Sequence, residues 1–172
     1  MGCGTWSWGN QLLWGYEEEQ DGELRSVFEY TVEEQRKIEQ TSALFDTGDS
    51  YGTGKLNGRS EALLGEFRKD LIAGKGADVG ADVGDRCLFA TKLATYPWRL
   101  TRGSLVKACE GSLERLQVDQ IDLCQLHWPA SNYNPLQERA LWEGIGDIHD
   151  KGLAKAVGVS NYGPKQLVKI NR

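Results

Sequence analysis

The chain has little of what metal sites and nucleic-acid surfaces need. Only two histidines occur, His127 and His149, so any histidine chemistry must use one of them. The four cysteines are widely spaced in apolar surroundings and make neither a metal-ligand nor a disulfide pattern. We therefore expect buried thiols and no metal site. The net charge of −5 argues against a nucleic-acid partner or an anionic membrane surface.

Long apolar runs are missing as well. No run approaches the roughly 20 residues that a membrane helix needs, so we expect no membrane partner. The first residues have neither a basic region nor an apolar segment, and no Ser- and Arg-rich transit segment is present. The sequence as written predicts a soluble, cytoplasmic protein. A chloroplast protein is the alternative, if an upstream transit segment is missing.

What the sequence does contain is an alternation of short apolar strands and amphipathic helices. We expect five strands and five helices, the strands at 4–9, 42–46, 87–91, 120–126 and 154–159, and the helices at 24–40, 59–70, 101–116, 135–151 and from 164 onward. Strands that are apolar on both faces, each followed by a helix, predict an α/β fold with a parallel sheet covered by helices. Both an open doubly wound sheet and a (β/α)8 barrel fit this pattern.

The glycine-rich segments do not match phosphate-binding motifs. Residues 4–9 lack the G-x-G-x-x-G that usually follows the first strand of a doubly wound dinucleotide domain. Residues 52–55 look like part of a Walker loop, but Asp49 stands where that motif needs glycine and Leu56 where it needs serine or threonine. Residues 77–84 repeat Ala-Asp-Val-Gly twice, without the spacing of a calcium loop. For these residues we expect a surface loop.

Polar residues follow successive strands at corresponding places. Asp46, Lys92, His127 and the pair Ser160-Asn161 each stand at the C-terminal end of an expected strand, and Tyr51 lies in the loop after the second. In a parallel barrel these ends converge on one face, where active sites are built. A lysine after an all-apolar strand would be costly to bury without a partner. Asp46 is the natural partner of Lys92.

Five motifs, in this order, span nearly the whole chain: Gly4-Thr5-Trp6, residues 45–52 with Ser60-Glu61, residues 90–92, residues 126–129 and residues 157–161. In order and spacing they resemble the aldo-keto reductases, which are NAD(P)H-dependent carbonyl reductases built on a (β/α)8 TIM barrel. The runs at 8–16 and 96–101 are most similar to the plant-type, often plastid-located branch of that family.

The resemblance implies a specific chemistry for the polar residues. Hydride would pass from the nicotinamide to a substrate carbonyl while Tyr51 gives a proton to the developing alkoxide. Lys92 would favour the phenolate form of Tyr51, and Asp46 would hold Lys92 in place and charged. His127 would orient the carbonyl and share in the proton relay.

The resemblance also implies the cofactor NADP(H) and a small-molecule carbonyl substrate. The implied cofactor-binding residues are Gly4, Thr5, Trp6, Asp46, Ser160 and Asn161, the last two at the nicotinamide carboxamide. Four aromatic residues are expected either to wall the carbonyl pocket or, equally, to serve as packing: Trp8, Tyr96, Trp98 and Trp128. Neither the physiological substrate nor the preference for NADP over NAD follows from the sequence.

The resemblance covers five strand–helix units, whereas a barrel needs eight and typically about 250 residues. We therefore expect residues 1–172 to be the truncated N-terminal part of a single barrel domain. We expect the chain alone to bind NADPH weakly, to turn over little and to self-associate through its open sheet edges. The alternatives are a reductase-like regulatory subunit, of the kind that attaches to potassium channels, and a non-catalytic fragment.

Overall fold

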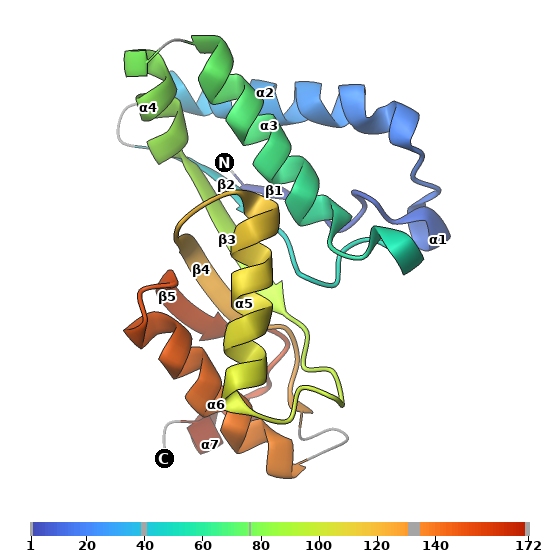
Figure 1. The fold of residues 1–172 in the computed structure, drawn as a ribbon, viewed down its shortest axis with the longest axis vertical. Coiled ribbons are helices and arrows are strands. Elements are labelled where there is room, and N and C mark those ends of the chain that lie inside the picture. Colours follow the sequence, from blue (N-terminus) through green and yellow to red (C-terminus); the bar gives the residue numbers. More distant parts are fainter. Residues whose placement is uncertain (1, 39–40, 76, 131–134, 171–172) are drawn as a thin grey trace.

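A computed structural model describes residues 2–38, 41–75, 77–130 and 135–170, and its strands form one parallel sheet (Figure 1). The strands are hydrogen-bonded in the order of the sequence: β1 (Gly2–Gly4), β2 (Ala43–Asp46), β3 (Cys87–Leu93), β4 (Ile121–Leu126) and β5 (Ala154–Val159). A doubly wound sheet reverses its strand order part-way. A sequential order without reversal is that of a barrel, so these five units form part of a (β/α)8 barrel.

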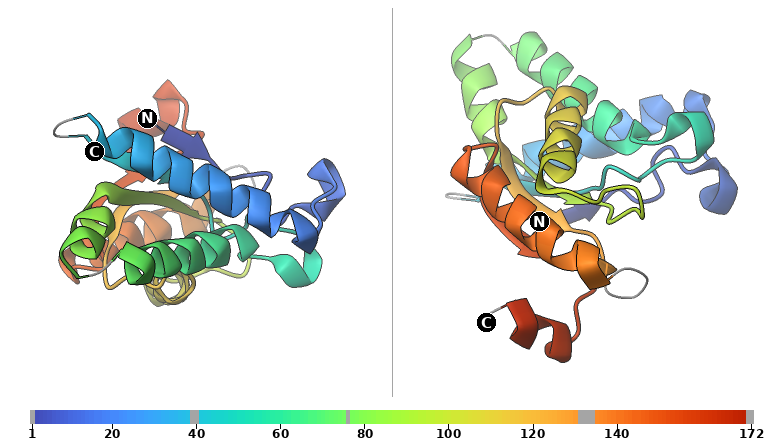
Figure 2. Two further views of the ribbon diagram at one scale, coloured as in Figure 1. Left: turned by 90° about the horizontal axis from the view of Figure 1, so that it is seen from above. Right: turned by 60° about the horizontal axis from the view of Figure 1, so that its bottom comes forward.

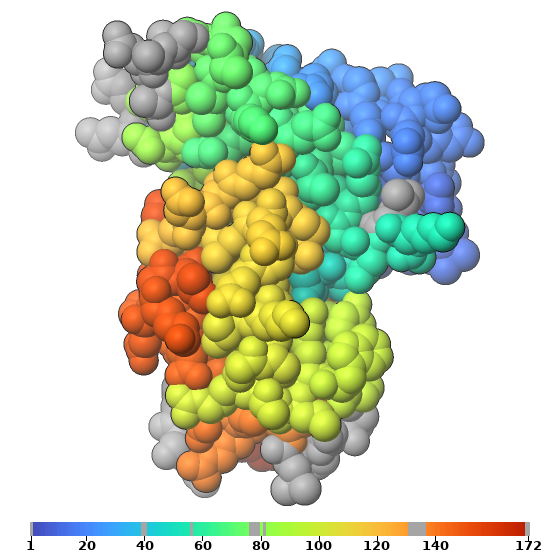
Figure 3. Space-filling model, in the orientation of Figure 1, coloured from blue at the N-terminus to red at the C-terminus, as the bar shows by residue number. Residues whose placement is uncertain are grey.

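Helices connect the strands. The longer ones are α2 (Asp21–Arg36), α3 (Arg59–Lys75), α4 (Ala77–Arg86), α5 (Arg102–Leu116), α6 (Pro135–Asp150) and α7 (Pro164–Ile170), with a short α1 (Gln11–Trp14) after β1. Helices α3, α5 and α6 pack side by side over one face of the sheet, and α3 and α5 dominate the view in Figure 3. Figure 2 shows α7 set apart from the other helices. In the described ranges no helix is long and apolar enough to cross a membrane.

Aromatic side chains fill the space between the sheet and the helices. Phe45 of β2 stacks on Phe28 of α2 with ring centroids 4.7 Å apart, and it also lies against Phe89 of β3 at 6.2 Å. Phe67 of α3 contacts Phe28 at 6.1 Å. All four rings are at most 1% exposed. This core fixes the outer face of β2 and β3, so the alternate residues of these strands point to the opposite, inner face.

Two expectations about the chain path were wrong. The strand expected at 4–9 lies earlier, at Gly2–Gly4, because the chain turns at Thr5, whose carbonyl accepts from Trp8 N at 3.0 Å. The loop expected at 77–84 is part of helix α4. Gly80 and Gly84 of the repeat lie directly against α3, where a Cβ atom would stand 2.8 Å from the Ile72 carbonyl oxygen and 3.0 Å from an Arg68 nitrogen. Close packing on α3 therefore overrides the poor helix propensity of glycine.

Gly65 marks the closest approach of α3 to α5. A Cβ atom there would lie 2.7 Å from the carbonyl carbon of Leu116 and 2.8 Å from its oxygen, both backbone atoms that cannot rotate away. We expect Gly65→Ala to lower the free energy of unfolding by about 2 kcal/mol, because overpacking outweighs the gain in helix propensity. Gly146→Ala in α6 is the matched control, since a Cβ there meets nothing within 4 Å. Gly146→Ala should raise the free energy of unfolding, measured with urea, by about 0.5 to 1 kcal/mol.

Candidate active site

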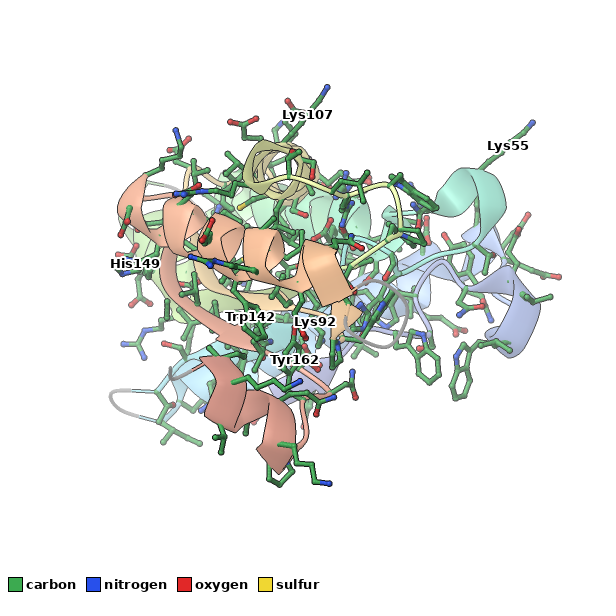
Figure 4. All side chains as sticks on the ribbon, turned by 90° about the horizontal axis from the view of Figure 1, so that it is seen from below. Lys55, Lys92, Lys107, Trp142, His149 and Tyr162 are labelled. Atoms are coloured by element: carbon green, nitrogen blue, oxygen red, sulfur yellow. The ribbon has the colours of Figure 1, made fainter. Side chains whose placement is uncertain are left out.

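Lys92 is the centre of a polar cluster on the inner face of the sheet. It is the second-last residue of β3, and Asp46 at the end of β2 pairs in register with Ala90, two positions earlier. The Lys92 ammonium donates to the Asp46 carboxylate, to the Thr47 carbonyl at 3.0 Å and to the Tyr51 hydroxyl at 3.3 Å. Its side chain is 9% exposed. In Figure 4, Lys92 lies inside the molecule, whereas Lys55 and Lys107 point away from it.

These contacts account for the burial of a charge at this position. An ammonium group has three N–H donors, and each finds an acceptor. The Asp46 carboxylate supplies the opposite charge, so the largely buried Lys92 side chain has a charged partner. One of the three donors is thereby aimed at the Tyr51 phenol oxygen.

The loop after β2 places Tyr51 over Lys92. Gly48 accepts from Tyr51 N at 3.0 Å, and a Cβ on Gly48 would stand 3.2 Å from the Tyr51 ring, so a glycine lets the ring lie against the backbone. Asp49 ties this loop to the segment after β3. Its buried carboxylate accepts from Ala94 N at 2.9 Å and from Arg99 Nη1 at 2.6 Å. No local pattern in the sequence indicates this function for Asp49, because its partners lie about fifty residues away along the chain.

His127 lies beside Tyr51, with ring centroids 5.6 Å apart and the planes at 65°. Its backbone is fixed, since His127 N donates to the Leu93 carbonyl at 3.0 Å and its own carbonyl accepts from Asn161 Nδ2 at 2.8 Å. Burial, together with the nearby Lys92 charge, lowers the pKa of His127 to about 4. The imidazole is therefore neutral near pH 7 and acts there as a neutral hydrogen-bonding group.

An open concavity of about 470 Å³ lies in front of these residues. It is lined by Trp6, Ser50, Tyr51, His127, Trp128 and Asn161. The Tyr51 phenol, the His127 imidazole and the Asn161 carboxamide thus face the same space. Ser50 was not expected at this site, and no local pattern in the sequence distinguishes it from an ordinary turn serine.

The family model described as the aldo/keto reductase family matches residues 1–172. The chain belongs to this family. Among its relatives is the chloroplastic pyridoxal reductase of Arabidopsis thaliana, 53% identical over 171 residues, which cover 99% of this chain and 44% of that protein. The aldo-keto reductase YhdN of Bacillus subtilis is 33% identical, over 97% of this chain and 44% of its own length. The chain thus spans less than half the length of these relatives.

Solved structures of the family share the fold. An aldo/keto reductase from Klebsiella pneumoniae, in complex with NADP and acetate, superposes with a TM-score of 0.72 at 25% identity. The match covers 99% of this chain and 48% of that one. Five parallel strands matched to about half of a longer family chain confirm the expectation of a partial barrel.

In this aldo/keto reductase chain the expected aromatic residues separate into two groups. Tyr96 stacks on Trp98 at 4.5 Å and meets Trp128 edge-on at 6.2 Å, while Trp128 lies 4.5 Å from the His127 ring. These three rings extend from the concavity outward to Trp98, which is 70% exposed. Trp8 is different. It is 4% exposed and packs in the core 6.1 Å from Phe67, so it serves as packing and is not brought to the concavity.

The expected cofactor-binding residues also separate. Thr5 is fully buried, and its hydroxyl is occupied within the protein by the Asp46 carbonyl at 3.0 Å and by Ser60 Oγ at 2.6 Å. Gly4 is exposed, with open space where a Cβ would stand. At the other end of the sheet, Ser160 N donates to the Leu126 carbonyl at 2.8 Å, which places Ser160 and Asn161 directly after β5. Trp6 and Asn161 line the concavity; Thr5 does not.

Proposed function

We propose that this chain carries the catalytic residues of an NADP(H)-dependent oxidoreductase that reduces aldehydes and ketones to alcohols, with Tyr51 as the proton donor. The observation that carries the proposal is the Lys92 ammonium, which is held by Asp46 and donates to the Tyr51 hydroxyl at 3.3 Å. A cation hydrogen-bonded to a phenol stabilises the phenolate that remains once the proton has left. This arrangement suits an acid that protonates an alkoxide in the concavity.

The residues present fit a nicotinamide cofactor. A carboxamide needs both a donor and an acceptor. The Asn161 side chain lines the concavity, and the Ser160 hydroxyl oxygen lies 3.3 Å from Asn161 Nδ2. Family members from Klebsiella pneumoniae have been solved in complex with NADP and with NADPH. When bound, the cofactor supplies the hydride. The chain's own residues would hold the nicotinamide end, orient the carbonyl through His127 and deliver the proton from Tyr51.

The substrate class follows from the walls of the concavity and from the relatives. Trp6 and Trp128 line the concavity together with Tyr51 and His127 and offer flat apolar surfaces, which suits a ring-bearing carbonyl compound. The relative that is 53% identical is named a pyridoxal reductase. We propose pyridoxal, an aromatic aldehyde, as the first substrate to test, and the chloroplast, which that relative's name gives, as the compartment.

The proposal includes weak activity for the 172-residue chain alone. The 172 residues span less than half the length of the curated relatives, so by themselves they would hold the cofactor at one end only. The test is therefore a chimera, in which residues 1–172 replace the matching part of the Arabidopsis relative. Its NADPH oxidation is followed by absorbance with pyridoxal, an aliphatic aldehyde and a ketone.

We expect the chimera to reduce pyridoxal and the isolated chain to show little turnover and weak quenching of NADPH fluorescence. A folded chimera that binds NADPH tightly but reduces none of the carbonyls would contradict the enzyme and favour a reductase-like regulatory subunit. Micromolar NADPH binding by the isolated chain would contradict the weak-binding part of the proposal alone.

A further inference from the structure

Ser50 contacts the His127 ring directly. Its Oγ lies 3.3 Å from His127 Nδ1, and both side chains line the concavity. Ser50 thus offers a hydroxyl group to one ring nitrogen of the imidazole at the centre of the site.

The contact matters because a neutral imidazole carries a single N–H. Which nitrogen bears the proton is set by the hydrogen bond that the other nitrogen makes. To orient a carbonyl oxygen, the ring needs an N–H donor directed at the substrate, so the other nitrogen must act as an acceptor. The only side chain paired with a His127 ring nitrogen among the described residues is Ser50.

We propose that Ser50 is a positioning residue, which donates its hydroxyl hydrogen to His127 Nδ1 and thereby keeps the ring proton on Nε2, available to a substrate carbonyl. The inference rests on the proposed function.

The surroundings of both residues hold the contact in place. The His127 ring contacts Tyr51 and Trp128, whose ring centroids are 5.6 and 4.5 Å away, and these contacts restrict its rotation. Ser50 follows the buried Asp49, which is tied to Arg99, and precedes Tyr51, whose N–H bonds Gly48. The serine therefore sits on a segment that is anchored on both sides.

The ring nitrogens can be observed directly by long-range ¹⁵N–¹H NMR of the 172-residue chain. With only two histidines the spectrum is simple, and His149→Gln assigns the exposed one. We expect wild-type His127 near pH 7 to show a pyridine-like Nδ1 and a pyrrole-like Nε2. Ser50→Ala should give averaged shifts of the two tautomers, and Ser50→Thr should restore the wild-type pattern. Ser26→Ala, which removes an exposed helix hydroxyl, is the control and should change nothing.

A pyrrole-like Nδ1 in the wild type, or an unchanged spectrum in Ser50→Ala, would overturn the proposal. In the chimera, Ser50→Ala should lower kcat about five- to ten-fold with little change in KM, the effect of losing about one hydrogen bond. The NMR measurement needs no turnover. An inactive chimera would therefore overturn the proposed function while the spectrum still decides the tautomer.

Discussion

Replacing Tyr51 by phenylalanine should reduce the kcat of the chimera by about 10² to 10⁴-fold, the usual contribution of a positioned general acid. The ring would stay where it is, because it lies close against Gly48 and beside the His127 ring, 5.6 Å away between centroids. Only the hydroxyl, with its 3.3 Å hydrogen bond from Lys92, is removed. NADPH quenching and urea unfolding should therefore change little while single-turnover reduction of pyridoxal almost stops.

Tyr30→Phe is the matched control for this variant. It deletes the same atom from a tyrosine on α2 that is 63% exposed and lies outside the concavity. Its activity should equal that of the parent. If Tyr51→Phe kept more than a tenth of the parent kcat, Tyr51 would not be the proton donor and another acid would have to be sought.

The largest loss of stability is expected from Arg115→Met. Glu61 is fully buried in α3, and its carboxylate is bound by the Thr91 hydroxyl and by Arg115, whose Nε is 2.7 Å away. Removing the guanidinium leaves a buried carboxylate without its cation, which typically costs about 3 to 5 kcal/mol. Urea unfolding at pH 7 measures the loss directly. Arg139→Met, in an exposed pair with Glu143, should change stability by less than about 1 kcal/mol.

The stability lost in Arg115→Met should become smaller as the pH falls. Burial raises the pKa of the Glu61 carboxyl above its ordinary value, and removing Arg115 would raise it further. A group whose pKa is higher in the folded state favours folding at low pH, and that benefit disappears as the pH rises through the folded-state pKa. The deficit of Arg115→Met should therefore shrink between pH 7 and pH 5. A deficit that grows in this range would mean that Glu61 is not the residue left unpaired.

The parts of the site that the sequence predicts are those built on strands. Asp46, Lys92 and His127 are visible because each interrupts or ends an apolar run, and parallel strands carry such residues to one edge. The structure brings these three together with Tyr51. Their catalytic roles stay predictions until the variants are measured.

The parts that the sequence does not predict depend on contacts between distant segments. Asp49 is hydrogen-bonded to Ala94 and Arg99, and Ser50 is hydrogen-bonded to His127. Each partner lies more than forty positions away along the chain. A turn at Thr5 directs the Trp8 side chain into the core. The alternation of bulky and small residues in the sequence does not predict this turn. Helix propensity alone also gives a wrong prediction for residues 77–84. The two glycines there predict a loop, but the segment is helical and packs closely against α3.

The repeat in α4 has a consequence for how this chain can change in length. A unit of four residues advances a helix by about 6 Å and brings its side chains round to within about 40° of where they began. Gly80 and Gly84 accordingly face α3 one turn apart, each against Ile72. Because β3 begins immediately after Arg86 and α3 ends at Lys75, gaining or losing one copy shifts the start of α4 by about one turn relative to the end of α3. A change of four residues would thus keep the glycines directed at α3, whereas insertion of two residues would turn them away from it.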